Sequence, residues 1–373
     1  MFKKSSLLSI AVASVLLMSC SGNGSYTIKG TATGLEENAL VTLYSLVDNM
    51  TVPVDSAHVK GGKFTIKGST DTCDVALLAF TDDYQERICS FFLEQGTIKI
   101  QYDAENDVQT IGGTKINDSF QKFYEKVQVL NDKAVELQDK IQVTSAAGQE
   151  VQSFYDEMQG LQNQYMEIVK SSIIDNSNNV FGFHQLMDSY DLFEPAEVEG
   201  FIQALAPVFG TNPDLNALSE LVEIQLSTSE GRQFTDFQLP ILKGGKTDDT
   251  AMLSDYVGKK KVVLLDFWAS WCEPCRRSIP ELKELYAKYA AKGLEIVSVS
   301  VDTNLESWME AVSEEGMTWP QLIDASNGDD NSPASKYAVM AIPSTFLIDA
   351  DGTIIARNLM TEELAEALED IFK

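Results

Sequence analysis

Residues 26–112 carry short apolar and β-branched runs that are separated by turn residues. These runs occupy positions 26–30, 39–44, 63–68, 75–80 and 88–93. Runs of this length and composition are typical of β-strands. Gly61 and Gly62 stand between Val59 and Phe64 and predict a tight hairpin. We therefore expect a small all-β sandwich over residues 26–114.

Beyond residue 115 the apolar positions change to steps of three and four. One set runs from Phe120 to Ile141 and a second from Val151 to Ile168, and each set forms one apolar face of a helix. A polar stretch that contains Gly148 separates them, which predicts an antiparallel helical hairpin. Shorter helices are expected at 179–190, 195–207 and 213–227, completing a helical region over 115–228.

Residues 229–373 alternate between strand and helix patterns. Strands are expected at 261–268, 294–301, 344–349 and 353–357, and helices at 281–293, 304–316 and 361–373. Asp351-Gly352 predicts a hairpin between the last two strands. Together these patterns indicate a multidomain chain that ends in an α/β domain.

The first residues resemble a lipoprotein signal peptide. Lys3 and Lys4 precede an apolar stretch over 7–18, which is too short to span a bilayer as a mature helix. The stretch ends in a lipobox-like motif at Cys20. We expect a signal peptide over 1–19, lipidation of Cys20 and a flexible tether over 20–25. Removal of residues 1–19 would change the net charge from −28 to −30.

Composition excludes several classes of protein. The 373 residues include 28 Lys+Arg and 56 Asp+Glu. A nucleic-acid-binding protein carries a basic face, so we expect no nucleic-acid partner. The chain has 2 histidines and 5 cysteines, too few for a His-rich metal site or a disulfide scaffold. We expect neither a metal nor another cofactor.

A Cys-Glu-Pro-Cys motif directly follows the strand expected at 261–268. Unpaired N–H groups and a partial positive charge at a helix N-terminus favour a thiolate, so the pKa of Cys272 should be low. Pro274 fits the first helical turn. Cys272 is expected to be the exposed nucleophile, and Cys275, one turn into the helix, the more buried resolving thiol.

Residues 266–275 resemble the active-site strand and turn of thioredoxin, and Ile-Pro-Ser-Thr at 342–345 resembles its second signature. The Cys-Glu-Pro-Cys form with an export signal is similar to the TlpA/ResA-like branch of thiol:disulfide oxidoreductases. The resemblance implies a cis Pro343 beside Cys272 and a buried carboxylate, Asp266, as general base for Cys275. Trp271, Glu273 and Pro274 are expected to support the cysteines, and Trp268 to lie in the core.

Residues 26–68 resemble the small β domain, of the DUF4369 type, found before a thioredoxin domain in Bacteroidetes-type lipoproteins. Tyr-x-Ile-x-Gly at 26–30, Val-Asp-Ser-Ala at 54–57 and Gly-Lys-Phe-x-Ile-x-Gly at 62–68 carry this resemblance. It implies no catalytic role for that domain. Cys73 and Cys89 remain open between buried thiols, a structural disulfide and a redox role. In a hairpin that turns near residue 83, Cys73 would lie opposite residue 94 rather than Cys89. His58 and His184 are interpreted as packing or surface residues.

These observations predict a lipid-anchored, periplasm-facing thiol-disulfide oxidoreductase of the cell envelope that reduces protein disulfides through Cys272 and Cys275. Its expected partners are protein disulfides or dithiols, an upstream membrane electron donor or acceptor, and the membrane itself. A thiol-dependent peroxidase is one alternative. The other is a binding or scaffold lipoprotein whose redox domain is accessory.

Overall fold

The structure is a computed structural model that describes residues 24–47, 50–82, 86–326, 329, 331–359 and 361–373. The signal segment, Cys20 and residues 21–23 of the expected tether lie outside the described residues. The chain forms two compact units that divide between Ser219 and Glu220. Each unit has its own hydrophobic core, and the two are described separately.

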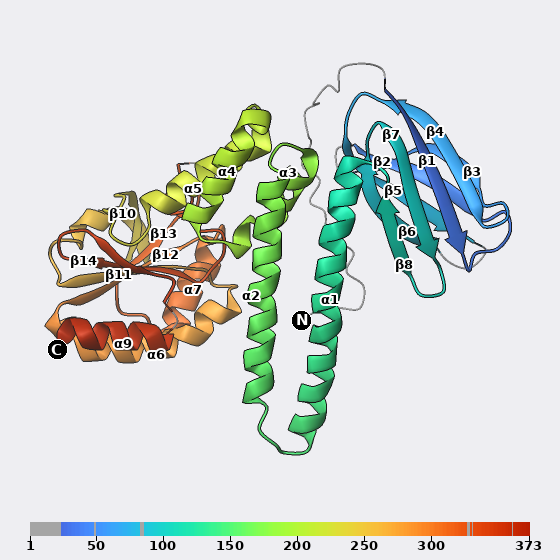
Figure 1. Cartoon of the computed structure of the whole chain (residues 1–373). Coiled ribbons are helices and arrows are strands. Elements are labelled where there is room, and N and C mark those ends of the chain that lie inside the picture. The colour runs from blue at the N-terminus through green and yellow to red at the C-terminus, as the bar shows by residue number, and fades with distance from the viewer. Residues whose placement is uncertain (1–23, 48–49, 83–85, 327–328, 330, 360) are drawn as a thin grey trace. The chain divides into compact units, whose positions relative to one another are not determined.

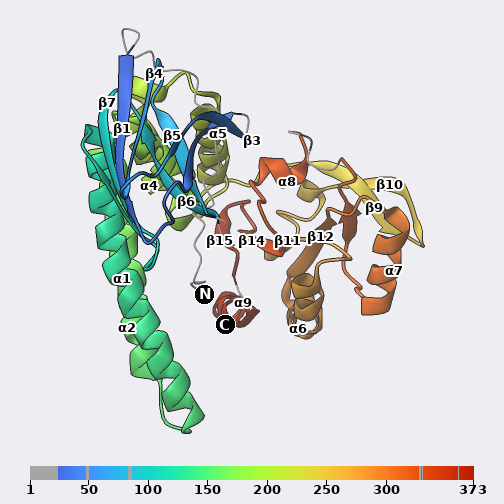
Figure 2. The same cartoon turned by 90° about the vertical axis from the view of Figure 1, so that its right-hand side faces the viewer.

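The first unit begins with two four-stranded sheets, ordered β4-β1-β7-β8 and β3-β2-β5-β6 (Figures 1 and 2). Their strands are β1 (Gly24–Thr33), β2 (Leu40–Val47), β3 (Met50–His58), β4 (Lys63–Thr70), β5 (Asp74–Thr81), β6 (Glu86–Leu93), β7 (Gly96–Asp103) and β8 (Val108–Gly112). Ile28 and Ile98 of one sheet share a core with Val41 and Leu78 of the other. The predicted β sandwich is confirmed.

The turn at Gly61-Gly62 carries the chain from one sheet to the other. Both glycines have positive φ, 56° and 71°, which glycine adopts at little cost, and Lys60 bridges to Lys63 across the turn. Beyond this bridge β3 pairs with β2, whereas β4 pairs with β1. The tight turn is therefore confirmed, but the predicted hairpin is wrong because the two strands belong to different sheets.

The register of the antiparallel β5–β6 pair determines how far apart Cys73 and Cys89 lie. Asp74 pairs with Leu93 and Leu78 pairs with Cys89, so Cys73 lies next to the register position of residue 94, as predicted. The two cysteines are five register positions apart, about 16 Å at the rise of a strand, and form no disulfide with each other. Cys89 is a fully buried thiol.

Two long helices follow the sandwich. α1 (Lys115–Ala146) and α2 (Gln152–Asp175) run antiparallel (Figure 1) and enclose a core of Leu130, Leu137 and Leu161. Gly148, at a φ of 67°, lies in the turn between them. The predicted helical hairpin is confirmed. The shorter helices α3 (Val180–Met187), α4 (Pro195–Phe209) and α5 (Pro213–Ser227) also agree with the predicted pattern.

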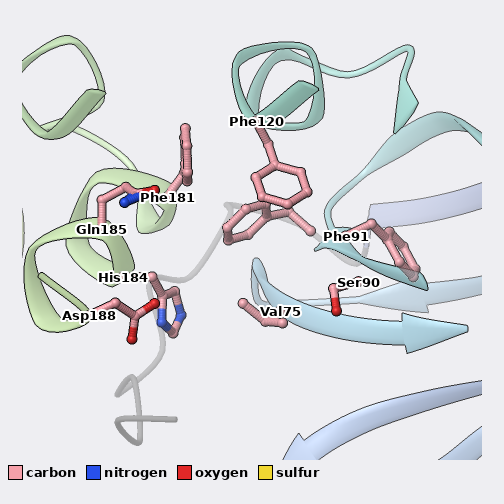
Figure 3. A pocket seen from close by; sticks show the side chains of 9 residues that line it. Val75, Ser90, Phe91, Phe120, Phe181, His184, Gln185 and Asp188 are labelled. Atoms are coloured by element: carbon pink, nitrogen blue, oxygen red, sulfur yellow. The ribbon is translucent and has the colours of Figure 1, made fainter. Parts of the chain in front are cut away.

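α1 and α3 pack against β6 through a buried amide and an aromatic cluster. The Asn117 side chain accepts a hydrogen bond from the Phe92 N–H at 2.9 Å and donates one to the Phe92 carbonyl at 2.7 Å. His184 of α3 is buried, and its Nε2 lies 3.0 Å from Oδ1 of Asp74. Figure 3 shows Phe181 and His184 facing β5 and β6 across a cavity of about 20 Å³, which is room for about one water. His184 is therefore a packing residue, as predicted.

The second unit is built on a seven-stranded sheet ordered β10-β9-β13-β12-β11-β14-β15. Its strands are β9 (Gln238–Lys243), β10 (Lys246–Met252), β11 (Val262–Trp268), β12 (Leu294–Ser300), β13 (Gln321–Ile323), β14 (Ser344–Asp349) and β15 (Ile354–Arg357). Its helices are α6 (Glu273–Tyr289), α7 (Leu305–Glu315), α8 (Pro333–Lys336) and α9 (Thr361–Phe372). β11 and β12 are parallel, whereas β14 is antiparallel to β11. The expected α/β fold is confirmed.

The two faces of β11 pack into different cores. Leu264 and Trp268 lie in a cluster with Cys272 and Cys275, and Leu265 and Phe267 lie in the cluster on the opposite face. Side chains alternate between faces along a strand, so Asp266 lies on the same face as Trp268 and the cysteines.

None of the helices in the described ranges is both long enough and apolar enough to cross a membrane.

Candidate active site

Cys272 and Cys275 form a disulfide at the start of α6, with Cα atoms 5.3 Å apart. Cys272 is the N-cap of α6, and the backbone N–H of Cys275 donates to its Sγ at 3.2 Å. This N–H and the helix dipole would both stabilise a thiolate at Cys272 after reduction. Glu273 and Pro274 occupy the first turn and are exposed.

The predicted exposure of Cys272 is wrong for the disulfide form. Cys272 is 4% exposed and Cys275 is 2% exposed, so the expected order holds but both residues are buried. The cover comes partly from a neighbouring loop, because the Ile342 carbonyl oxygen lies 3.7 Å from Cys272 Sγ. The adjacent Trp271 is 69% exposed, which leaves its indole accessible to another molecule. Trp268 is in the core, as predicted.

The loop that covers Cys272 contains the cis peptide Ile342–Pro343, which confirms the predicted isomer. Pro343 is exposed and directly precedes β14, and Met340 of the same loop is 66% exposed. Exposed apolar side chains are therefore neighbours in sequence both of Cys272 and of the carbonyl that lies against its sulfur.

Asp266 is 6% exposed within β11. Burial raises the pKa of its carboxyl to about 6, and a hydrogen bond from the Ser298 hydroxyl opposes this rise. The predicted burial is confirmed, and the direction of the pKa shift agrees with the prediction. A carboxyl with this pKa can take up and release a proton near neutral pH.

Two charged residues that the sequence did not single out, one buried and one partly buried, hold the loops around the disulfide. Asp302, two residues after the end of β12, accepts hydrogen bonds from the Ser270 N–H at 2.8 Å and the Ser270 hydroxyl at 2.7 Å. Arg357 of β15 donates to the carbonyls of Tyr337 and Ala338, each at 3.1 Å. Asp302 thus fixes the turn before Cys272, and Arg357 fixes the segment before the cis peptide. Asp302 follows β12, which runs parallel to β11, so the two strands end at the same edge of the sheet. This shared edge could have predicted from the sequence that Asp302 lies near the cysteines.

The described residues contain no group of three or more His, Cys, Asp or Glu side chains arranged to hold a metal ion. What the site offers chemically is a cysteine pair in disulfide form, with a buried carboxyl of raised pKa on the same face of the sheet. The fold and the site together define a protein of the thioredoxin class.

Comparisons with known proteins give the same class. Residues 231–357 match the AhpC/TSA family, and residues 26–120 match DUF4369, a domain of unknown function. The chain is similar to thiol-disulfide oxidoreductase ResA of Bacillus thuringiensis subsp. konkukian, with 33% identity over 143 residues that cover 38% of this chain and 76% of the relative. ResA of Geobacillus kaustophilus is 38% identical over 144 residues, covering 38% of this chain and 77% of the relative.

Solved structures with similarity to the chain include the thioredoxin domain of a thiol-disulfide oxidoreductase from Bacteroides vulgatus. It is 29% identical with a TM-score of 0.35, and the match covers 39% of this chain and 99% of that one. A thiol-disulfide oxidoreductase from Bacteroides fragilis is 29% identical with a TM-score of 0.34, covering 38% of this chain and 99% of that one. On the extent of its identity with the ResA proteins, the chain belongs to the ResA-like thiol-disulfide oxidoreductases of the thioredoxin family.

Proposed function

We propose that this enzyme reduces protein disulfides outside the cytoplasm, at the Cys272–Cys275 pair, while anchored to a membrane through a lipid on Cys20. The observation that carries the redox proposal is the disulfide itself. It caps α6, its Cys272 sulfur accepts the Cys275 N–H at 3.2 Å, and the Ile342 carbonyl lies 3.7 Å from that sulfur.

The proposed reaction starts from the dithiol. The Cys272 thiolate attacks one sulfur of the substrate disulfide, so that a Cys272–substrate disulfide forms and the first substrate thiolate leaves. Cys275 then gives its proton to Asp266 and attacks the Cys272 sulfur. The Cys272–Cys275 disulfide forms, the second substrate thiolate leaves, and both substrate thiolates are protonated by solvent or Asp266. Two electrons pass to the substrate, and an upstream donor must return them.

An extended apolar segment of a protein fits the proposed substrate site. The backbone beside Pro343 would pair with the substrate chain as a strand does. The exposed Trp271 and Met340 would contact its side chains. These uncharged groups lie on a chain with a net charge of −28, so apolar contact rather than charge would select the segment.

The equilibrium reduction potential of the Cys272–Cys275 pair tests the direction of electron flow. We expect a value near the thioredoxin figure of about −270 mV, measured by tryptophan fluorescence in glutathione buffers. A value near about −120 mV would instead identify an oxidant that inserts disulfides. If no two-electron transition appears, the redox proposal is wrong.

The proposed location rests on the first residues of the sequence. Lys3, Lys4 and the apolar stretch over 7–18 support export, and the lipobox-like motif supports lipidation of Cys20. In cells, the full chain is expected in the membrane fraction, and Cys20→Ala is expected in the soluble extracytoplasmic fraction. Equal membrane association of both forms would exclude the lipid anchor. Cytoplasmic retention of both would exclude export.

A further inference from the structure

Asp266 is held by a neutral partner. The Ser298 hydroxyl donates to Oδ2 of Asp266 at 2.8 Å, and the two residues are register partners on β11 and β12. Ser298 is fully buried. In the part of the chain that the structure describes, no charged side chain shifts the pKa of this carboxyl, which responds to burial and to Ser298. The hydroxyl is therefore the main group that stabilises the ionised form.

A tryptophan fixes the direction of that hydroxyl. Trp319 Nε1 donates to Ser298 Oγ at 2.9 Å. An indole N–H is only a donor, so Ser298 accepts from Trp319 and its own proton points to Asp266. The backbone strengthens this placement, because the Ser298 N–H donates to the Pro320 carbonyl at 3.0 Å. Trp319 is itself buried and packs edge-to-face on Tyr286, with ring centroids 5.5 Å apart.

We infer that Ser298 and Trp319 are positioning residues for Asp266, and that their relay of hydrogen bonds selects the carboxylate oxygen that exchanges the proton. The donated Ser298 proton occupies Oδ2, which makes Oδ1 the oxygen that takes the proton from Cys275. This inference rests on the proposed function, because it assigns the relay to the step in which Cys275 attacks.

The surroundings of Asp266 explain why a neutral relay matters. The apolar cluster on the same face of β11 as Asp266 includes four titratable side chains, which are Cys272 at the N-cap of α6 and Cys275, Tyr286 and Tyr289 within α6. β12, β13, β14, α7 and α9 contribute apolar side chains to the same cluster. Without the Ser298 donor the ionised carboxylate would be less stable, and Asp266 would act as a base only at higher pH.

One experiment separates the two cysteine steps. The reduced full chain is mixed with an equimolar amount of 5,5′-dithiobis(2-nitrobenzoate) in a stopped-flow instrument, and thionitrobenzoate release is followed between about pH 4 and 9. The first release reports attack by Cys272. The second reports attack by Cys275 on the mixed disulfide, which is the step assigned to Asp266.

The variants are Ser298→Ala, which removes the hydroxyl, and Trp319→Phe, which removes the indole N–H. For Ser298→Ala we expect the pH midpoint of the second release to rise by about one pH unit. Below the native midpoint, the rate of the second release should then be about ten-fold lower. Trp319→Phe should shift it in the same direction by less. Ser298→Thr retains the hydroxyl and should keep the native midpoint.

Trp308→Phe is the matched control. Trp308 is fully buried in the same cluster, and its Nε1 has no hydrogen-bond partner among the described residues. Trp308→Phe removes the same side-chain volume as Trp319→Phe and should leave the pH midpoint of the second release unchanged. A native midpoint in both Ser298→Ala and Trp319→Phe would overturn the inference while leaving the proposed function intact. If Ser298→Ala does not fold, the pH midpoint of Trp319→Phe is compared with that of Trp308→Phe, and equal midpoints would overturn the inference. Absence of a rapid first release in the unmodified chain would overturn the proposed function itself.

Discussion

Cys272→Ser is expected to lower disulfide reductase activity to the uncatalysed background. A serine hydroxyl at the N-cap of α6 can still accept the Cys275 N–H, so the helix should remain, but it supplies no thiolate to attack a disulfide. Cys275→Ser should behave differently, because the first attack is retained and the resolving thiol is missing. We expect this variant to accumulate a covalent Cys272–substrate disulfide, detected by non-reducing electrophoresis and mass spectrometry.

Cys89→Ala provides the control for a general effect of removing a thiol. Cys89 is fully buried in the β sandwich, and burial raises the pKa of its thiol to about 12, so it should be inert and its removal should not change turnover. Near-normal activity of Cys272→Ser, or a trapped adduct that forms on a different cysteine, would contradict the assignment of the nucleophile.

Asp266→Asn is expected to slow the second cysteine step by about 100-fold at neutral pH while leaving the first step unchanged. The amide retains the size of the carboxyl and can still accept the Ser298 hydrogen bond, but it cannot accept the proton of Cys275. The two releases of thionitrobenzoate described above measure the steps separately. Equal slowing of both releases would show that the substitution damages the site in general.

The same substitution should raise stability, with a pH dependence of known sign. Burial raises the pKa of Asp266 to about 6, whereas the carboxyl of an unfolded chain titrates near about 3.9. Ionisation of Asp266 therefore costs native stability above about pH 6, on the order of 3 kcal/mol. Asp266→Asn removes this cost, so its gain should be full above that pH and should disappear as the pH falls toward about 4.

Glu295→Gln is the matched control for both measurements. Glu295 is also a buried carboxylate, on β12, but it accepts a hydrogen bond from the Tyr286 hydroxyl at 2.8 Å and pairs with Lys260 at 3.0 Å. It should show normal cysteine kinetics and no gain in stability at neutral pH. Urea unfolding over a series of pH values measures the free energy of unfolding of each variant. An equal stability gain in Glu295→Gln and Asp266→Asn would show that the gain does not come from the raised pKa of Asp266.

Local sequence was sufficient for elements whose signals repeat along one segment. α1 and α2 were predicted because their apolar positions recur every three to four residues. β11 and β12 were predicted because strands buried on both faces are rich in Val, Ile and Leu. By contrast, β10 is mostly exposed and polar, and β3 is exposed along nearly its whole length and contains Pro53. Each pairs with the strand directly before it in the sequence, β9 and β2 respectively, but their exposed side chains give no apolar pattern that would predict them.

At the site, local sequence identified the cysteine pair and its place at a helix N-terminus, because a thiol pair two residues apart and a helix start are local properties. The cis proline and the buried carboxyl were implied by the resemblance of residues 266–275 and 342–345 to thioredoxin. Three contacts were visible only in the tertiary structure. Asp302 bonds to Ser270, and Arg357 bonds to the carbonyls before the cis peptide. Trp319 bonds to Ser298, which in turn bonds to Asp266. Such hydrogen bonds join residues that are 19 or more positions apart, and the pairing of strands and packing of loops decide which side chains meet.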